Sequence, residues 1–213
     1  MKLTLIVIGA LVLAGCGQAA SAPASSSPSQ SVPGSTSPSP SAEARLPVVP
    51  GPPVPLAAGT YLTPKGFEPS MSITLPTGWY GGASLQDFGV GQGIDQVHQT
   101  FGGGGLSVSA LDMPYDQAVA EFRKLPGLDH ARKPTTGMLG GYEATTFYAH
   151  ARSGHVLLDP IAPAADIGTS STQQVFVDAN GTAILIRMEL NDDAARAEIE
   201  EVIASIEFPD AGS

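Results

Sequence analysis

The sequence is poor in residues that define several protein classes. It has one cysteine in 213 residues, so no disulfide can form within the chain. Charged residues make up 14%, with ten basic side chains against twenty acidic ones. This balance argues against DNA or RNA as a partner, because a nucleic-acid-binding surface is a concentrated positive field. The apolar content of 42%, with 25 Gly and 19 Pro, excludes a coiled coil and a highly charged disordered chain.

The N-terminus has the pattern of an export leader. Lys2 precedes an apolar run from Leu3 to Leu13. The run is about eleven residues long, against the ~20 that span a bilayer as a helix, so a permanent transmembrane anchor is the weaker interpretation.

The next residues, Leu13-Ala14-Gly15-Cys16, resemble the lipobox of exported bacterial lipoproteins of the actinobacterial type. The resemblance implies a diacylglycerol on the Cys16 thiol and signal-peptidase cleavage between Gly15 and Cys16. Residues 1–15 are then a lipoprotein signal peptide. The predicted location is the extracytoplasmic face of the cell membrane, with the lipid anchor as the membrane contact. An ordinary leader with a chance cysteine is the alternative.

A low-complexity segment follows the cysteine. Ser and Pro make up half of residues 17–56, which therefore lack the apolar surface needed to fold. We expect residues 16–56 to be a disordered tether, with polyproline II character in its second half and with O-glycosylation left open. A single domain is expected over residues 57–213.

Within that domain, periodicity predicts strands and two helices. An amphipathic helix is expected from Tyr115 to Leu125, and a second helix is expected to start at Asn191-Asp192-Asp193. Its buried stripe would be Ala195, Ile199, Val202, Ile203 and Ile206, and its solvent face Arg196, Glu198, Glu200 and Glu201. Strands are expected at 71–75, 85–90, 97–101 and 106–110, with hairpins around Gly140-Gly141 and Asn180-Gly181.

These elements predict an α+β fold, in which a mainly antiparallel sheet of six to eight strands packs with two or more helices. Residues 67–79 and 204–208 resemble exported lipoproteins of high-GC Gram-positive bacteria. More distantly, they are similar to LpqN/PsbP-type α/β sandwich proteins. The resemblance implies a binding or accessory role without catalysis.

No catalytic constellation is apparent, and no catalytic residue or cofactor is predicted. Gly102–Gly105 lacks the Lys-Ser/Thr of a phosphate-binding loop and is expected to be a mobile hairpin loop. Serines 107, 109, 170 and 171 have no Gly-x-Ser-x-Gly motif and no identifiable base. The histidines at 98, 130, 150 and 155, with Asp159, match no metal-ligand spacing, so no metal site is predicted.

The most informative irregular segment is 151–171. More than twenty residues without periodicity are uncommon in a compact domain unless they are functional or misassigned. It is interpreted either as a packed strand with a loop or as a flap, which would place a ligand site against the sheet near Trp79. The predicted function is a non-catalytic binding or accessory module for an envelope protein, a polymer or a small ligand. A lipid or hydrophobic-ligand carrier and an enzyme with an unrecognised site are the alternatives.

Overall fold

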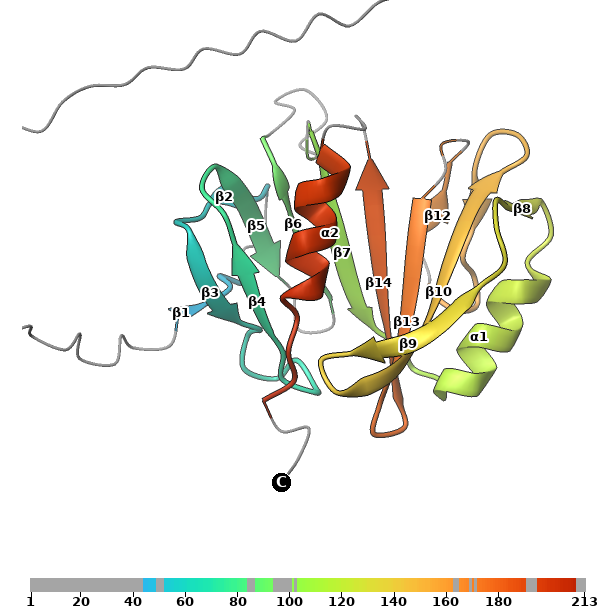
Figure 1. The fold of residues 1–213 in the computed structure, drawn as a ribbon, viewed down its shortest axis with the longest axis horizontal. Helices are drawn as coiled ribbons and strands as arrows, with labels where there is room; N and C mark the ends of the chain where they lie inside the picture. Colours follow the sequence, from blue (N-terminus) through green and yellow to red (C-terminus); the bar gives the residue numbers. More distant parts are fainter. Residues whose placement is uncertain are drawn as a thin grey trace, which may run out of the picture. The chain divides into compact units, whose positions relative to one another are not determined.

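A computed structural model describes residues 44–48, 52–83, 87–93, 101, 103–162, 165–168, 170, 172–190 and 195–209. They form an α+β fold with a large antiparallel sheet and two helices, α1 (Tyr115–Lys124) and α2 (Arg196–Ala204), as the sequence predicts (Figure 1). In this part of the chain, neither helix has the length and hydropathy to cross a bilayer. The predicted signal peptide and Cys16 lie outside the described residues.

The main sheet has nine strands, and every pairing within it is antiparallel. The strand order is β2 (Val54–Pro55), β5 (Trp79–Ala83), β6 (Asp87–Gln92), β7 (Gly104–Ala110), β14 (Thr182–Leu190), β13 (Thr172–Ala179), β10 (Tyr142–Ala151) and β8 (Leu128–His130). The ninth strand, β9 (Thr135–Leu139), also pairs with β10. Strands β2, β5 and β8 were not predicted. Of the strand expected at 97–101, only Phe101 is described, and it is not in a strand.

Both predicted tight hairpins are confirmed. Gly140 and Gly141 join β9 to β10, and each has a positive φ, at 56° and 91°. Asn180 and Gly181 join β13 to β14 with φ values of 57° and 87°. Two consecutive residues at positive φ define the turn whose twist matches that of the paired strands, which is why Asn-Gly and Gly-Gly specify it locally.

A smaller sheet consists of β1 (Ala44–Arg45), β3 (Gly59–Leu62) and β4 (Ser72–Leu75), in that order. The expected start of the domain at residue 57 is therefore too late. β1 pairs in parallel with β3, Leu46 is buried in the core, and β2 pairs with β5. Pro is tolerated there because β2 is an edge strand and needs few ladder hydrogen bonds.

The glycine run is a second correction. Gly104 and Gly105 belong to β7 rather than to a loop, while Gly102 lies outside the described residues. Gly105 pairs with Gly91 of β6, and a Cβ on Gly105 would lie only 2.8 Å from the Gly91 Cα. A side chain at Gly91 would collide with the Phe101 ring. The glycines therefore allow a close approach of backbone and ring, which is a packing role.

The two faces of the main sheet are covered differently. On one face, α2 lies beside β4, and its buried residues Ile199, Val202 and Ile203 share a core with Ile73, Trp79 and Ile186. Ile206 just beyond α2 completes the predicted buried stripe with Ala195. On the other face, α1 packs Phe122 against Phe147 of β10 and Phe176 of β13, with ring centroids 4.8 and 5.2 Å from that of Phe122. Both helices bury the predicted apolar stripes.

The segment at 151–171 is an ordered part of the α1 face. It forms the two-stranded pair β11 (Val156–Leu157) and β12 (Asp166–Ile167), joined to the core by Leu158, Ile161, Ala162 and Ile167. We call residues 155–168 the arm, of which 163 and 164 are not described. The arm therefore has its own strands and its own apolar anchors, and it is more than a loop.

Candidate functional site

A pocket of about 340 Å³ lies between the arm and the main sheet. We call it the arm pocket. Its lining comes from the arm, from Ser170 and from strands β13 and β14. It consists of His155, Asp166, Ile167, Gly168, Ser170, Thr172, Gln174, Arg187, Met188 and Glu189. Most of these residues are polar or charged. The volume falls at the lower end of the range of about 300 to 1,000 Å³ that is typical of small-molecule sites.

Strand pairing positions the polar floor of this pocket. Ser107 of β7, Arg187 of β14, Gln174 of β13 and Phe147 of β10 lie directly opposite one another in successive strands. Residues paired across neighbouring strands point to the same face, so this row faces the arm. The adjacent row contains Leu185 and Phe176, which belong to the apolar core under α1. The pocket therefore begins where the apolar face of the sheet becomes polar.

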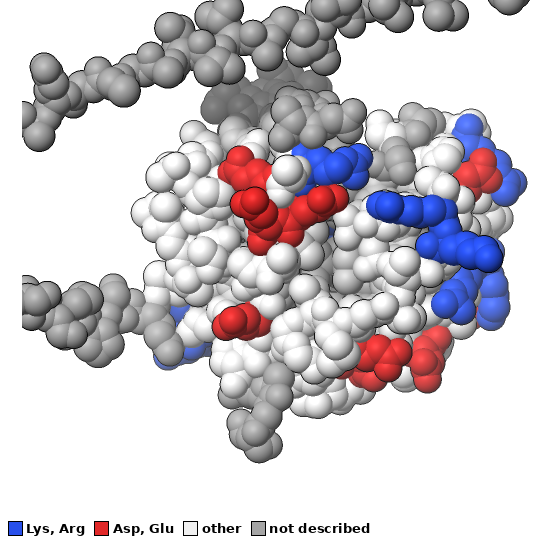
Figure 2. Space-filling view, in the orientation of Figure 1, with Lys and Arg blue, Asp and Glu red and all other residues white. Residues whose placement is uncertain are grey.

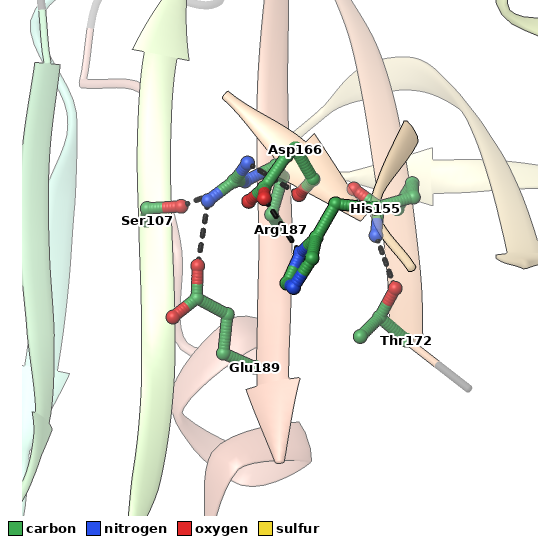
Figure 3. Close-up of polar contacts among 7 residues, drawn as sticks. Ser107, His155, Asp166, Thr172, Arg187 and Glu189 are labelled. Carbon is green, nitrogen blue, oxygen red and sulfur yellow. Dashed lines mark hydrogen bonds and ion pairs between the residues drawn. The ribbon is translucent and has the colours of Figure 1, made fainter. Parts of the chain in front are cut away.

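Arg187 is held by three hydrogen bonds at the centre of the site (Figure 3). Its Nε donates to Ser107 Oγ at 3.1 Å, its Nη1 to the Asp166 carbonyl oxygen at 3.0 Å, and its Nη2 to Glu189 Oε1 at 2.6 Å. The Arg187 side chain is only 14% exposed. A guanidinium fixed on three sides is rigid, and its two remaining N–H groups are still donors.

Gln174 has a buried acceptor that nothing in the described chain satisfies. The residue is 1% exposed, and its Nε2 donates to Thr172 Oγ1 at 2.7 Å. Its Oε1 has no hydrogen-bond partner. A buried, unpaired polar atom costs about 1–3 kcal/mol, so natural structures rarely keep one without a function or a bound molecule.

The rim of the pocket is formed by an ion pair within the arm. His155 Nδ1 lies 2.7 Å from Asp166 Oδ2, and the histidine is charged only when it is protonated. Both side chains are well exposed, unlike Gln174 and Arg187 on the floor. In Figure 3 they lie on the arm, over the strand that carries Arg187. The site therefore has a buried polar floor and a solvent-exposed charged rim.

A second cleft, of about 250 Å³, lies on the opposite face between β9, β13 and α2. Gln173 contributes to it, and the Gln173 Oε1 is also buried without a partner. Figure 2 shows Asp and Glu side chains gathered over α2 on this face, and Lys and Arg side chains over α1 and β8. The cleft has one charged lining residue, Glu200, and no fixed donor comparable to Arg187.

The hypothesis of a ligand site between the 151–171 segment and Trp79 is wrong. Trp79 belongs to the core under α2, whereas the arm packs on the face that carries α1. The indole Nε1 of Trp79 donates to Glu198 Oε1 at 2.6 Å. Glu198 is therefore a partner of a buried tryptophan and only partly a solvent-face residue.

The pocket does bring together a serine, a histidine and an aspartate, namely Ser170, His155 and Asp166. Nδ1 of the histidine faces the carboxylate, which is the orientation that a catalytic triad requires. No hydrogen bond joins Ser170 to His155 in the described part of the chain, and the Asp166 side chain is 44% exposed. A triad carboxylate is normally buried, so the exposed Asp166 differs from the carboxylate of a catalytic triad.

The other predicted candidates are dispersed. His130 lies in β8 and His150 in β10, His155 pairs with Asp166 rather than with Asp159, and His98 lies outside the described residues. Among the residues with described positions, no three His, Cys, Asp or Glu side chains come together as metal ligands would. Ser107 serves as an acceptor for Arg187.

Two titratable groups outside the pocket have displaced pKa values. Burial raises the pKa of Tyr115, although a hydrogen bond with Thr145 Oγ1 at 2.7 Å opposes the shift. The hydrogen bond from Arg152 to Asp129, 2.6 Å long, lowers the pKa of that carboxyl. Burial and the named hydrogen-bond partners explain both pKa shifts, so neither shift indicates a functional site.

Sequence reasoning missed Gln174 and Arg187. Their signal was a change from apolar to polar along one strand face: Phe176, Gln174 and Thr172 in β13, and Leu185, Arg187 and Glu189 in β14. The alternation of apolar and polar residues within each strand can be predicted from the sequence, but the strand register that places Gln174 opposite Arg187 cannot.

Comparison with known proteins yields distant structural similarity only. No family model matches the chain, and no curated protein matches it. Among solved structures, it is similar to cyanobacterial PsbP (CyanoP) from Synechocystis sp. PCC 6803, with 15% identity over 73% of this chain and 95% of that one and a TM-score of 0.44. A crystal structure from Bacteroides thetaiotaomicron VPI-5482 has 12% identity and a TM-score of 0.35, over 74% of this chain and about half (51%) of that one.

Proposed function

We propose that this chain is an extracytoplasmic lipoprotein, anchored through acyl chains on Cys16, whose domain is a non-catalytic binding module. The module holds a small polar molecule in the arm pocket. The observation that carries this proposal is the unpartnered Oε1 of Gln174, which is buried on the floor of a pocket beside a fixed arginine. An acceptor kept in that position is suited to a bound donor.

The anchor rests on the sequence. Leu13-Ala14-Gly15-Cys16 follows an export leader, and a low-complexity tether separates Cys16 from the first described strand at Ala44. Replacing Cys16 with Ser should abolish lipid modification and leave an unprocessed precursor. Metabolic labelling with a radiolabelled fatty acid tests this directly, and a labelled, mature Cys16→Ser product would refute the anchor.

Packing favours a binding module over a lipid carrier. A carrier needs an apolar cavity between helix and sheet. Under α1 that space is filled by Phe122, Phe147 and Phe176, each fully buried. The lining of the arm pocket is instead mainly polar or charged, which suits a hydrophilic ligand.

Native mass spectrometry of the mature chain, purified gently from the producing cell envelope, tests the site. The expected result is a small adduct that is lost in Gln174→Met. The matched control is Gln173→Met, because Gln173 is the neighbouring glutamine, has the same unpaired oxygen and lies in the other cleft. An adduct that is unaffected by Gln174→Met would contradict the proposal.

A further inference from the structure

We infer that the ligand of the arm pocket is an uncharged polyhydroxylated molecule, that is, a saccharide unit. This inference rests on the proposed function, since it names the chemical class held by the same site. It follows from three properties of the pocket: its free hydrogen-bonding groups, its local charge and the depth of its polar floor.

Residues that line the pocket carry unpaired hydrogen-bonding groups of both kinds. The acceptors are Gln174 Oε1 and the carboxylate oxygens of Glu189 and Asp166 that are not bonded to Arg187 or His155. The donors are the two N–H groups that Arg187 has left after its three bonds. A hydroxyl group both donates and accepts hydrogen bonds, so adjacent hydroxyls of one ligand can pair with the acceptors and with the donors at the same time.

The local charge disfavours an anion. Arg187 is the single permanent cation in the lining, and it is already bonded to Glu189, while Asp166 adds a second carboxylate. His155 contributes a positive charge only when it is protonated. A phosphate or carboxylate ligand would therefore face at least as much negative as positive charge.

The same lining disfavours a simple ammonium ligand. An ammonium group donates hydrogen bonds and accepts none, so it would leave the remaining Arg187 N–H groups without a partner. It would also lie beside a guanidinium that is only 14% exposed, and this repulsion would oppose the attraction of Asp166 and Glu189. A neutral ligand avoids both costs.

The depth of the floor sets the ligand's orientation. Gln174 and Arg187 lie at the bottom, and His155 and Asp166 of the arm lie at the exposed rim. One hydroxyl would donate to Gln174 Oε1 and its neighbour would accept from Arg187. The exposed imidazole of His155 then provides a less polar surface for the C–H face of a ring.

Saturation-transfer NMR on the purified mature chain in detergent micelles tests the inference. The probes are D-glucose, D-galactose, D-mannose and D-arabinose, with D-glucuronate and D-glucosamine as charged counterparts of the same ring size. At least one neutral sugar should bind with millimolar or tighter affinity and bind better than both charged rings. Gln174→Met should weaken that binding by at least about tenfold, the effect of one lost hydrogen bond, and Gln173→Met should leave it unchanged.

Other outcomes separate the two proposals. If glucosamine or glucuronate binds with the same dependence on Gln174 while every neutral sugar fails, the saccharide class is overturned and the arm pocket remains the site. If no probe binds but the envelope-derived adduct still depends on Gln174, the class is again overturned. If neither the binding of any probe nor the presence of the adduct depends on Gln174, both the saccharide class and the proposed function fail.

Discussion

Gln173 and Gln174 are neighbours in β13, and each has a buried amide oxygen without a hydrogen-bond partner. Because successive strand residues point to opposite faces, Gln174 lines the arm pocket and Gln173 lines the cleft between β9 and α2. The pair provides an internal control. Any effect common to both positions reflects the strand, and any effect confined to Gln174 reflects the arm pocket.

Gln174→Met should change the stability of the ligand-free domain little. The substitution removes an unpaired buried oxygen, which is stabilising, and also the hydrogen bond from Gln174 Nε2 to Thr172 Oγ1, which is destabilising. Thr172 Oγ1 keeps its hydrogen bond to the Ala149 carbonyl oxygen. Because the two effects oppose each other, we expect a free energy of unfolding within about 1 kcal/mol of wild type, measured by urea denaturation. A loss of more than about 2 kcal/mol would instead assign Gln174 a structural role.

Tyr115→Phe should destabilise the domain at neutral pH. The Tyr115 hydroxyl is within 2.7 Å of Thr145 Oγ1, and Thr145 is buried, so the variant leaves a buried hydroxyl unpaired. The expected loss is about 1–2 kcal/mol, measured by urea denaturation at pH 7.

The same variant should change the alkaline limb of the stability profile. Because the pKa of Tyr115 is raised in the folded state above its ordinary value of 10.0, the unfolded chain ionises first. The stability contribution is therefore fully present below pH 10 and is lost as the pH rises through the folded pKa. Stability of the wild type should fall more steeply above pH 10 than that of Tyr115→Phe, and parallel profiles would contradict this assignment.

Glu198→Ala should weaken the attachment of α2 to β5. Glu198 Oε1 accepts a 2.6 Å hydrogen bond from the Trp79 indole, which is otherwise enclosed in the core. The variant leaves a buried N–H unpaired, so we expect a loss of about 1.5–3 kcal/mol. Trp79 is the only tryptophan, so its fluorescence also reports the local change.

Glu201→Ala is the matched control for this prediction, since Glu201 is an exposed residue of the same helix. It should change the free energy of unfolding by no more than about 0.5 kcal/mol. Equal losses in the two variants would show that helix charge, rather than the indole hydrogen bond, carries the effect.

Arg152→Gln should raise the pKa of Asp129 toward its ordinary value. The guanidinium holds that pKa below 3.8, mainly through the hydrogen bond from Arg152 Nε to Asp129 Oδ1. The associated stabilisation is present above pH 3.8 and is lost as the pH falls through the folded pKa. Carbon-detected NMR titration of the Asp129 carboxyl measures the shift, and an unchanged midpoint in the variant would contradict this cause.

Much of the fold could be predicted because its signals are local. Asn180-Gly181 and Gly140-Gly141 specify tight turns by themselves, and the spacing of Tyr115, Ala118, Val119 and Phe122 specifies one helix face. The parallel pairing of Ala44 with Tyr61 is non-local, and its Pro-rich surroundings are typical of a disordered tether. That edge of the fold was therefore missed.

The candidate site was harder to predict for the same reason. The absence of periodicity at 151–171 correctly indicated an unusual segment. Which face of the sheet this segment covers depends on the packing of Leu158 and Ile161 in the core with α1, and that packing is not local. Gln174 is polar in a strand that is otherwise apolar at its centre, and only the pairing with Arg187 makes it part of a pocket.

The most direct test of the binding site is an NMR spectrum of the side-chain N–H groups of the mature chain. Spectra are recorded with and without the small-molecule extract of the producing cell envelope. The account predicts shifts of the Gln174 amide and of the Arg187 Nε–H, with the Gln173 amide unmoved. Shifts confined to Gln173 and β9, or no shift at Gln174 and Arg187, would contradict it.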